Sequence, residues 1–147
     1  MSVFSEDLII LDLIASDKVD AIKQMAAVAV AAGRGSDADA IAADVIARDE
    51  MGTPQIDGIA IPHARSSGVS DASVVVARTK GVIFDPEEGP AEVLFMILVP
   101  NDAGNQHIEI LSGLARRMMD PDFTSALRTT SDKSSLVQLL KSGENQE

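Results

Sequence analysis

The sequence predicts one domain, residues 1–147, of the α/β or α+β class, in which helices pack on a central sheet. Apolar residues recur at helical spacing in the first third of the chain and again after residue 105. The middle of the chain instead holds runs of β-branched residues bounded by turn formers. With 147 residues, 46% of them apolar, the chain can bury one core without cross-links. Helices, strands and helices in this order indicate a layered fold.

The N-terminal part is expected to form a short extended segment followed by a helix. Residues 8–13 are apolar and branched, which favours an edge strand or an extended arm. A helix then runs to about Ala31, with Ser16 or Asp17 as its N-cap, and Gly33 ends it.

A second helix is expected to end near Gly52. Ser36 and Asp39 resemble a capping box at its start, and Ile41 lies on its apolar face. Arg48 falls in the last turn, where a cation complements the helix dipole.

The middle of the chain is expected to supply the sheet. Residues 59–61 alternate as a short strand would, and residues 72–77 and 91–99 are rich in branched apolar residues, which is typical of buried strands. Residues 85–90 form a polar loop between strands, and the turn formers of residues 100–105 close the last strand.

The C-terminal part again shows a helical pattern. A helix is expected from about Gln106, with His107 in its first turn. One face of this helix is apolar (Ile108, Leu111, Leu114, Ala115 and Met118). Residues 123–127 and 135–140 predict two further helical stretches, and residues 142–147 are expected to form a flexible tail.

The chain is acidic, with 23 Asp and Glu against 12 Lys and Arg and a net charge of −11. Nucleic acid is not expected as a partner, because phosphate contacts need clustered cations. Base stacking needs aromatic platforms, whereas the chain holds four Phe and no other aromatic residue. The acidity therefore indicates either a solvated surface or attraction to a basic partner.

We expect a cytoplasmic protein. The absence of cysteine excludes disulfides and thiolate metal sites and fits a reducing compartment. Ser5, Glu6 and Asp7 interrupt the first apolar residues, so a secretory leader is not expected. No run approaches the roughly 20 apolar residues that cross a membrane.

The two histidines are the side chains that titrate near neutral pH without perturbation. His63 follows Pro62, whose fixed φ stiffens the backbone, so we expect His63 to be exposed at the rim of a strand. His107 lies at a helix N-terminus, where free amide groups and the helix dipole favour an anion. Arg48 could add a guanidinium group that matches phosphate oxygens. Together these groups predict reversible phosphorylation of a histidine.

The same residues allow simpler interpretations. Taken alone, each histidine is more often structural than catalytic, and Arg48 is most often a surface residue at a helix end. Histidines and carboxylates can also bind zinc, but no His-x₃-His or similar spacing occurs. We therefore expect no metal and no cofactor.

Two segments resemble the signature of a known family. Residues 48–53 (Arg-Asp-Glu-Met-Gly-Thr) and 58–65 (Gly-Ile-Ala-Ile-Pro-His-Ala-Arg) are similar to motifs of the enzyme IIA component of the bacterial phosphoenolpyruvate-dependent sugar phosphotransferase system, fructose/mannitol type (type 2). Residues 105–115 resemble the second histidine of that family and the leucine-rich helix behind it. The resemblance covers about residues 4–141 and implies a mixed sheet of roughly five strands flanked by helices on both faces.

The resemblance implies a role for each candidate residue. His63 would be the phosphoryl acceptor, and His107 would orient the site and hydrogen-bond the phosphoryl group. Arg48 would stabilise the phosphoryl charge, and Thr53 matches a position that carries a small hydroxyl group. Asp49 stands where the family usually has Glu, which leaves open how Arg48 is held.

By this resemblance, the chain accepts phosphate from the histidine-containing phosphocarrier protein and passes it to a IIB component. The IIB component would in turn serve a membrane permease (IIC) during uptake and phosphorylation of a fructose-like sugar. The alternative is a nitrogen-regulatory module of the same family, which signals by binding partners according to its phosphorylation state. The sequence does not separate these two functions.

Overall fold

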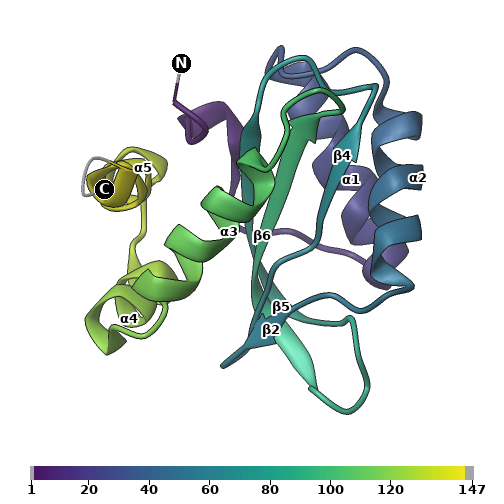
Figure 1. The fold of residues 1–147 in the computed structure, drawn as a ribbon. Coiled ribbons are helices and arrows are strands. Elements are labelled where there is room, and N and C mark those ends of the chain that lie inside the picture. The colour runs from purple at the N-terminus through teal and green to yellow at the C-terminus, as the bar shows by residue number, and fades with distance from the viewer. Residues whose placement is uncertain (1, 145–147) are drawn as a thin grey trace.

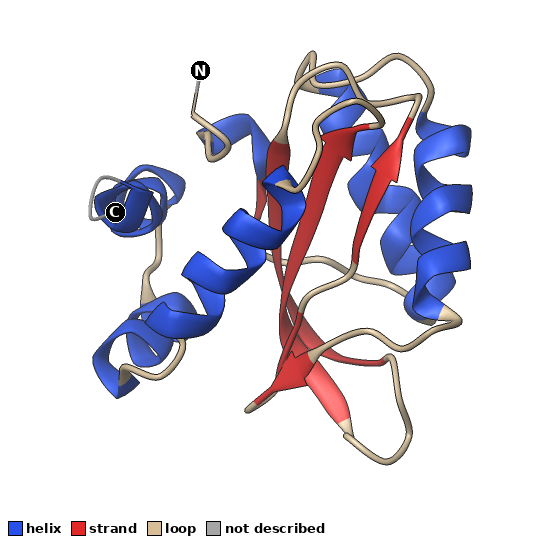
Figure 2. Cartoon of the chain, in the orientation of Figure 1, coloured by secondary structure: helices blue, strands red, loops and turns tan. Residues whose placement is uncertain are grey.

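A mixed six-stranded sheet lies between two layers of helices in the computed structural model, which describes residues 2–144. The elements are η1 (Glu6–Leu8), β1 (Ile9–Ile10), α1 (Lys18–Ala31), α2 (Ala38–Asp49), β2 (Gln55–Ile56), β3 (Ile59–Ala60), β4 (His63–Ser66), β5 (Ser73–Ile83), β6 (Pro90–Pro100), α3 (Gln106–Arg117), α4 (Pro121–Thr129) and α5 (Lys133–Glu144). Figures 1 and 2 show α1 and α2 on one side of the sheet, and α3, α4 and α5 on the other. The predicted fold class is confirmed.

The sheet is built on the long antiparallel pair of β5 and β6. Strand β1 runs parallel to β5, both β3 and β4 run parallel to β6, and β2 runs antiparallel to β3. Residues 55–66 thus form three short strands, where the sequence predicts one strand over residues 59–61. Pro62 separates β3 from β4 because it has no N–H to donate, although its carbonyl accepts a hydrogen bond from the Ile97 N–H at 3.0 Å.

Each face of the sheet carries its own apolar core. Along β6, Leu94, Met96 and Leu98 pack in the core beneath α1 and α2. The intervening residues belong to the core beneath α3, α4 and α5 (Val93, Phe95, Ile97 and Val99). Successive side chains of a strand point to opposite faces, so a run that is apolar at nearly every position fits a strand covered on both sides.

The start of α1 agrees with the sequence, whereas the start of α2 does not. Asp17 caps α1 by accepting a hydrogen bond from the Asp20 N–H at 2.8 Å. The predicted capping box at Ser36 is wrong, because Asp37 is the N-cap of α2. The Ser36 N–H instead donates to the carbonyl of Gly68 at 2.9 Å, which ties Ser36 to a neighbouring turn. The helix therefore begins one residue later.

Two helix ends also differ from expectation. Helix α2 ends at Asp49, and Gly52 lies beyond it in a turn with φ of +100°, a conformation that glycine adopts without strain. Helix α5 continues to Glu144, so residues 142–144 of the expected tail are helical. Residues 145–147 lie outside the described residues.

Candidate functional site

His63 is the first residue of β4, and only 6% of its surface is exposed. Its ladder partner is Ile97, which belongs to the core beneath α3, so the imidazole lies on the α3 face of the sheet. Helix α3 packs against both β4 and β6 and covers this position. The expectation of an exposed histidine is therefore wrong, although the strand end itself is where the sequence places it.

The Nδ1 atom of His63 donates a hydrogen bond to the carbonyl of Ile61 at 3.0 Å. Because a carbonyl oxygen can only accept, this contact assigns the proton to Nδ1 and leaves the lone pair on Nε2. Pro62 lies between the two residues and fixes the backbone that joins them. The imidazole is thus held in one tautomer, with its lone pair on Nε2.

The pKa of His63 lies below its usual value of 6.5. Burial is the largest cause, because it disfavours the charged imidazolium; the bond to Ile61 acts in the opposite direction, and the positive charge of Arg48 lowers the pKa further. His63 is therefore a neutral imidazole near pH 7, as nucleophilic attack requires.

His107 lies in the first turn of α3, beside His63. The two ring centroids are 6.2 Å apart and the rings are stacked at 25°. The Nδ1 atom of His107 is buried and has no hydrogen-bond partner among the described residues. Burial, followed by the charges of Arg65, His63 and Arg48, lowers the pKa of His107. The ring of His107 is thus held next to His63, with one buried nitrogen that no described residue satisfies.

Arg48 lies in the last turn of α2, half-buried, and its guanidinium donates to the carbonyl of Gly52 at 3.0 Å. Its charge acts on the pKa of both histidines, which places it within electrostatic reach of both rings. The structure thus brings Arg48 together with His63 and His107.

Thr53 has a different environment from the one expected. Its hydroxyl group donates to Oδ1 of Asp49, so its proton is already engaged within the chain. The second oxygen of Asp49, Oδ2, pairs with Lys18 Nζ at 2.6 Å. Within the described part of the chain, the side chain of Asp49 therefore interacts with Thr53 and Lys18 and not with Arg48. Arg48 is held instead by the carbonyl of Gly52.

Two cations near the site received no role from the sequence. Arg65 pairs in the ladder with Val99, beneath α3, and therefore lies on the same face as His63. Its guanidinium donates to the carbonyl of Gly104 at 3.2 Å, just before α3. A cation two residues after His63 on a strand is a signal that could have identified it. Lys18 could not be identified in this way, because it lies on α1, far from His63 in the sequence.

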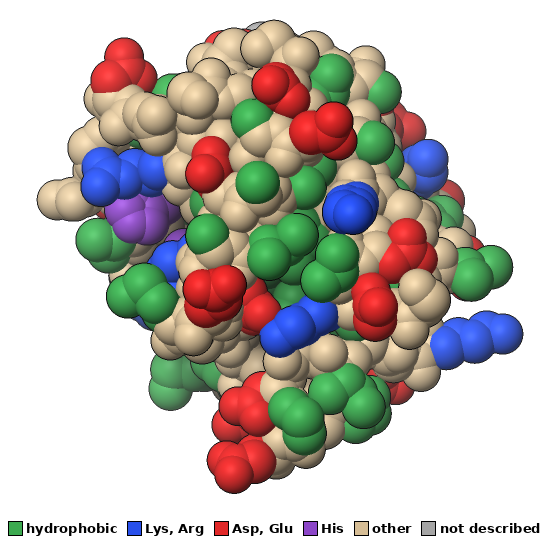
Figure 3. Space-filling model, turned by 90° about the vertical axis from the view of Figure 1, so that its right-hand side faces the viewer, with side chains coloured by type: hydrophobic (Ala, Val, Ile, Leu, Met, Phe, Trp, Pro, Cys, Tyr) green, Lys and Arg blue, Asp and Glu red, His purple; other side chains and the backbone are tan. Residues whose placement is uncertain are grey.

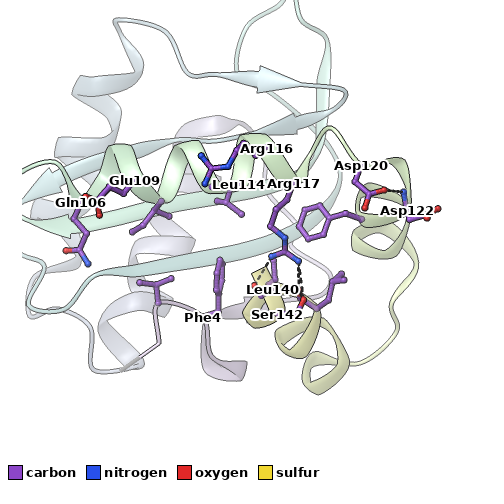
Figure 4. Close-up of a pocket in the computed structure, with 15 residues that line it drawn as sticks. Phe4, Gln106, Glu109, Leu114, Arg116, Arg117, Asp120, Asp122, Leu140 and Ser142 are labelled. Atoms are coloured by element: carbon purple, nitrogen blue, oxygen red, sulfur yellow. Dashed lines mark hydrogen bonds between the residues drawn. The ribbon is translucent and has the colours of Figure 1, made fainter. Parts of the chain in front are cut away.

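One cavity among the described residues is distinct from the histidine site. Figure 4 shows this cavity of about 750 Å³, which lies between the N-terminal segment, α3, α4 and α5 and contains none of the four predicted site residues. Arg117 points across it and donates to the carbonyl of Leu140 at 2.8 Å, which fastens α5 to α3.

The described residues contain no group of three or more side chains suited to hold a metal ion. In the same part of the chain, no helix has both the length and the apolar character needed to cross a membrane.

Comparison with known proteins identifies a family. Residues 2–143 match the model of a family described as "Phosphoenolpyruvate-dependent sugar phosphotransferase system, EIIA 2". The chain is 37% identical, over 91% of its length and 89% of the relative's, to the "PTS system fructose-specific EIIA component" of Haloferax volcanii.

Solved structures share the fold. The nitrogen regulatory protein IIA-Ntr of Neisseria meningitidis superimposes with a TM-score of 0.84 and 26% identity over 94% of this chain and 96% of that one. The mannitol IIA enzyme of Escherichia coli, solved in complex with phosphorylated mannitol IIB, superimposes with a TM-score of 0.78 and 22% identity over 95% of this chain and 97% of that one. The second likeness concerns the fold alone.

Proposed function

The chain belongs to the EIIA type-2 family of the phosphoenolpyruvate-dependent sugar phosphotransferase system, and from that premise we propose that it carries a phosphoryl group on Nε2 of His63. The observation that supports this proposal best is the hydrogen bond from His63 Nδ1 to Ile61, which leaves Nε2 free beside His107. Phosphotransfer is the general reaction of EIIA components.

The proposed reaction is an in-line transfer between two histidines. The Nε2 lone pair of His63 attacks the phosphorus of phosphohistidine on the histidine-containing phosphocarrier protein, and the N–P bond of the donor breaks as the new N–P bond forms. The released electron pair returns to the donor imidazole. Negative charge on the transferring oxygens would be stabilised by Arg48 and by the positive N-terminal end of α3 near His107. No proton has to leave His63, because Nε2 already carries the lone pair.

A docking partner would approach across exposed apolar side chains that follow Arg48 and His107 in the chain. Ile59 and Ile61, which precede His63 in the chain, are fully buried and cannot form this contact. Met51, after α2, is 81% exposed, and Ile108, next to His107, is 49% exposed. Both can be covered without breaking the core, which suits a transient interface with an apolar centre.

The surface charge suits a partner with basic groups. Figure 3 views the face that carries α2, where acidic side chains (red) are scattered and a histidine (purple) lies at the edge beside basic (blue) and hydrophobic (green) side chains. With a net charge of −11, the chain would attract a cationic partner over roughly one Debye length, about 8 Å at physiological salt.

We propose a IIB component as the acceptor and a fructose-like sugar as the final substrate, working in the cytoplasm. The fructose-specific relative from Haloferax volcanii supports the sugar class, and the mannitol IIA enzyme solved with phosphorylated IIB supports the partner. The link to a membrane permease would run through IIB.

A regulatory function is the second candidate. The similarity to a nitrogen regulatory protein, at a TM-score of 0.84, favours it specifically. A regulatory module would bind its target differently in the phosphorylated and unphosphorylated states, without passing phosphate to IIB. Adjacent genes for a sugar permease and a sugar-phosphate kinase would favour the transport function instead.

The test is phosphoryl transfer with purified components. The chain is incubated with the phosphorylated phosphocarrier protein, and acid-labile phosphate on the chain is measured. Transfer to IIB is then followed in membranes supplied with sugar. We expect His63→Ala to accept no phosphate while its circular dichroism stays that of the wild type. A folded His63→Ala that is labelled at the wild-type rate would remove the assignment.

A further inference from the structure

The carboxylate of Asp49, the residue after Arg48, interacts with two other side chains. Its Oδ2 pairs with Lys18 Nζ at 2.6 Å, its Oδ1 accepts the Thr53 hydroxyl, and its side chain is only 8% exposed. A carboxylate with so little access to water depends on these partners for its negative charge. Removing either partner would leave one oxygen uncompensated and turn the side chain toward water.

The turn of residues 50–54 connects this carboxylate to the reacting groups. Asp49 holds the beginning of the turn, because its carbonyl accepts the Gly52 N–H at 2.8 Å, while its side chain holds Thr53. The carbonyl of Gly52 in turn accepts the Arg48 guanidinium at 3.0 Å. The turn of residues 50–54 therefore contacts Arg48, the cation whose charge acts on both histidines.

The other end of the turn reaches His63 itself. The carbonyl of Pro54, next to Thr53, accepts the Ile61 N–H at 2.8 Å. The carbonyl of Ile61 accepts the His63 Nδ1–H at 3.0 Å. A displaced turn would shift the group that fixes the tautomer of His63 as well as the one that holds Arg48.

Lys18 anchors the whole path to the rest of the fold. It is the first residue of α1, and its Nζ donates to the carbonyl of Phe84 at 3.0 Å, between β5 and β6, in addition to pairing with Asp49. Its side chain is 36% exposed, so the ammonium group keeps some water while it contacts two separate segments. Lys18 thus holds the end of α2 against α1 and the β5–β6 loop.

We infer that Lys18 is a positioning residue for phosphoryl transfer, which acts through Asp49 and Thr53 on the turn that holds Arg48 and His63. This inference rests on the proposed function, because it concerns the alignment of the same site. Lys18 does not itself touch the reacting atoms; it sets where the guanidinium and the imidazole stand.

The experiment compares Lys18→Met with Lys23→Met, a matched change at an exposed position on the same helix. Single-turnover phosphorylation by saturating phosphocarrier is followed by rapid quench. Since a displacement of about 1 Å can cost up to about 100-fold in rate, we expect a loss of roughly tenfold for Lys18→Met, and a rate near that of the wild type for Lys23→Met. Lys18→Arg, which keeps the charge, should recover most of the rate.

A second readout separates positioning from general support of the fold. Because Lys18 acts on Arg48 as well as on His63, part of the loss caused by Lys18→Met should disappear in an Arg48→Ala background, where one of the two positioned groups is gone. Amide hydrogen exchange at Gly52 and Ile61 should also accelerate in Lys18→Met, whether or not phosphate is transferred. Should Lys18→Met not fold, Lys18→Gln, which retains a donor, takes its place in the same comparison.

The outcomes are distinct. A folded Lys18→Met that matches Lys23→Met in rate and exchange overturns the inference and leaves the proposed function intact. A full, additive loss in the Arg48→Ala background, with exchange at Gly52 and Ile61 unchanged by Lys18→Met, also overturns it. If the wild-type chain takes no phosphate but Lys18→Met still accelerates exchange at Gly52 and Ile61, the proposed function fails. The structural link from Lys18 to the turn of residues 50–54 is then still supported.

Discussion

Replacing Arg48 by alanine should separate two effects of one guanidinium. The first is on the rate of transfer: loss of one preorganised donor near a developing charge costs about 10- to 1000-fold, or about 1.4–4 kcal/mol. The second is on titration, because the charge of Arg48 contributes to the lowered pKa of both histidines. Without it, the pKa of His63 should rise while staying below 6.5, since burial, the larger cause, remains.

The two effects can be measured apart. Phosphoryl acceptance needs the neutral imidazole, so the rate should be flat above pH 6.5 and fall as the pH drops through the lowered pKa of His63. Arg48→Ala should move this fall to higher pH. At pH 7.5 His63 is neutral in both proteins, so a rate loss at that pH reports lost stabilisation of the phosphoryl charge and not a change in protonation.

Rapid-quench kinetics and NMR titration of the imidazole resonances give the rate and the pKa. Arg116→Ala, an exposed arginine on α3 outside the site, is the matched control. Wild-type rates at pH 7.5 together with an unmoved His63 titration in Arg48→Ala would show that the guanidinium does not act on this site, and the reasoning would be refuted.

Three further predictions concern the support, the surface and the core. His107→Ala should still accept phosphate but pass it to IIB slowly, measured as decay of the labelled chain; equal decay with the wild type would contradict this. The association rate with the phosphocarrier should fall as salt rises while the chemical step stays constant in stopped-flow experiments; a flat association rate would show that the acidity serves only solvation. Phe95→Ala, at a fully buried position, should lower the free energy of unfolding by about 3–5 kcal/mol in denaturant titrations. Met119→Ala, at a residue that is 83% exposed, should stay within about 0.5 kcal/mol of the wild type, and equal losses in both would argue against the assigned core.

The fold was predictable wherever local periodicity decides the structure. Residues 91–99 are apolar at almost every position, and β6 packs alternate side chains into the two cores. Asp17 caps α1 through a bond to its own first turn, which is a local signal. The capping box predicted at Ser36 was wrong because the Ser36 N–H donates to the carbonyl of Gly68, a contact that only the tertiary structure supplies.

The sequence indicated the residue types of the candidate site but not their environment. A proline before His63 indicated a rigid backbone, and the structure adds that the Ile61 carbonyl fixes the tautomer. Burial of His63 could not be inferred, because the covering helix α3 comes from a distant part of the chain. The pairing of Lys18 with Asp49 is likewise tertiary, since the two residues lie on different helices.

The central claim, that the phosphoryl group is carried on Nε2 of His63, has a direct test. The ¹⁵N-labelled chain is phosphorylated through the phosphocarrier protein, and ¹⁵N–³¹P couplings are recorded together with the imidazole proton resonances. The account predicts coupling of phosphorus to Nε2 of His63, with the Nδ1 proton retained against the Ile61 carbonyl. Phosphorus bonded to Nδ1 of His63, or to either nitrogen of His107, would contradict it.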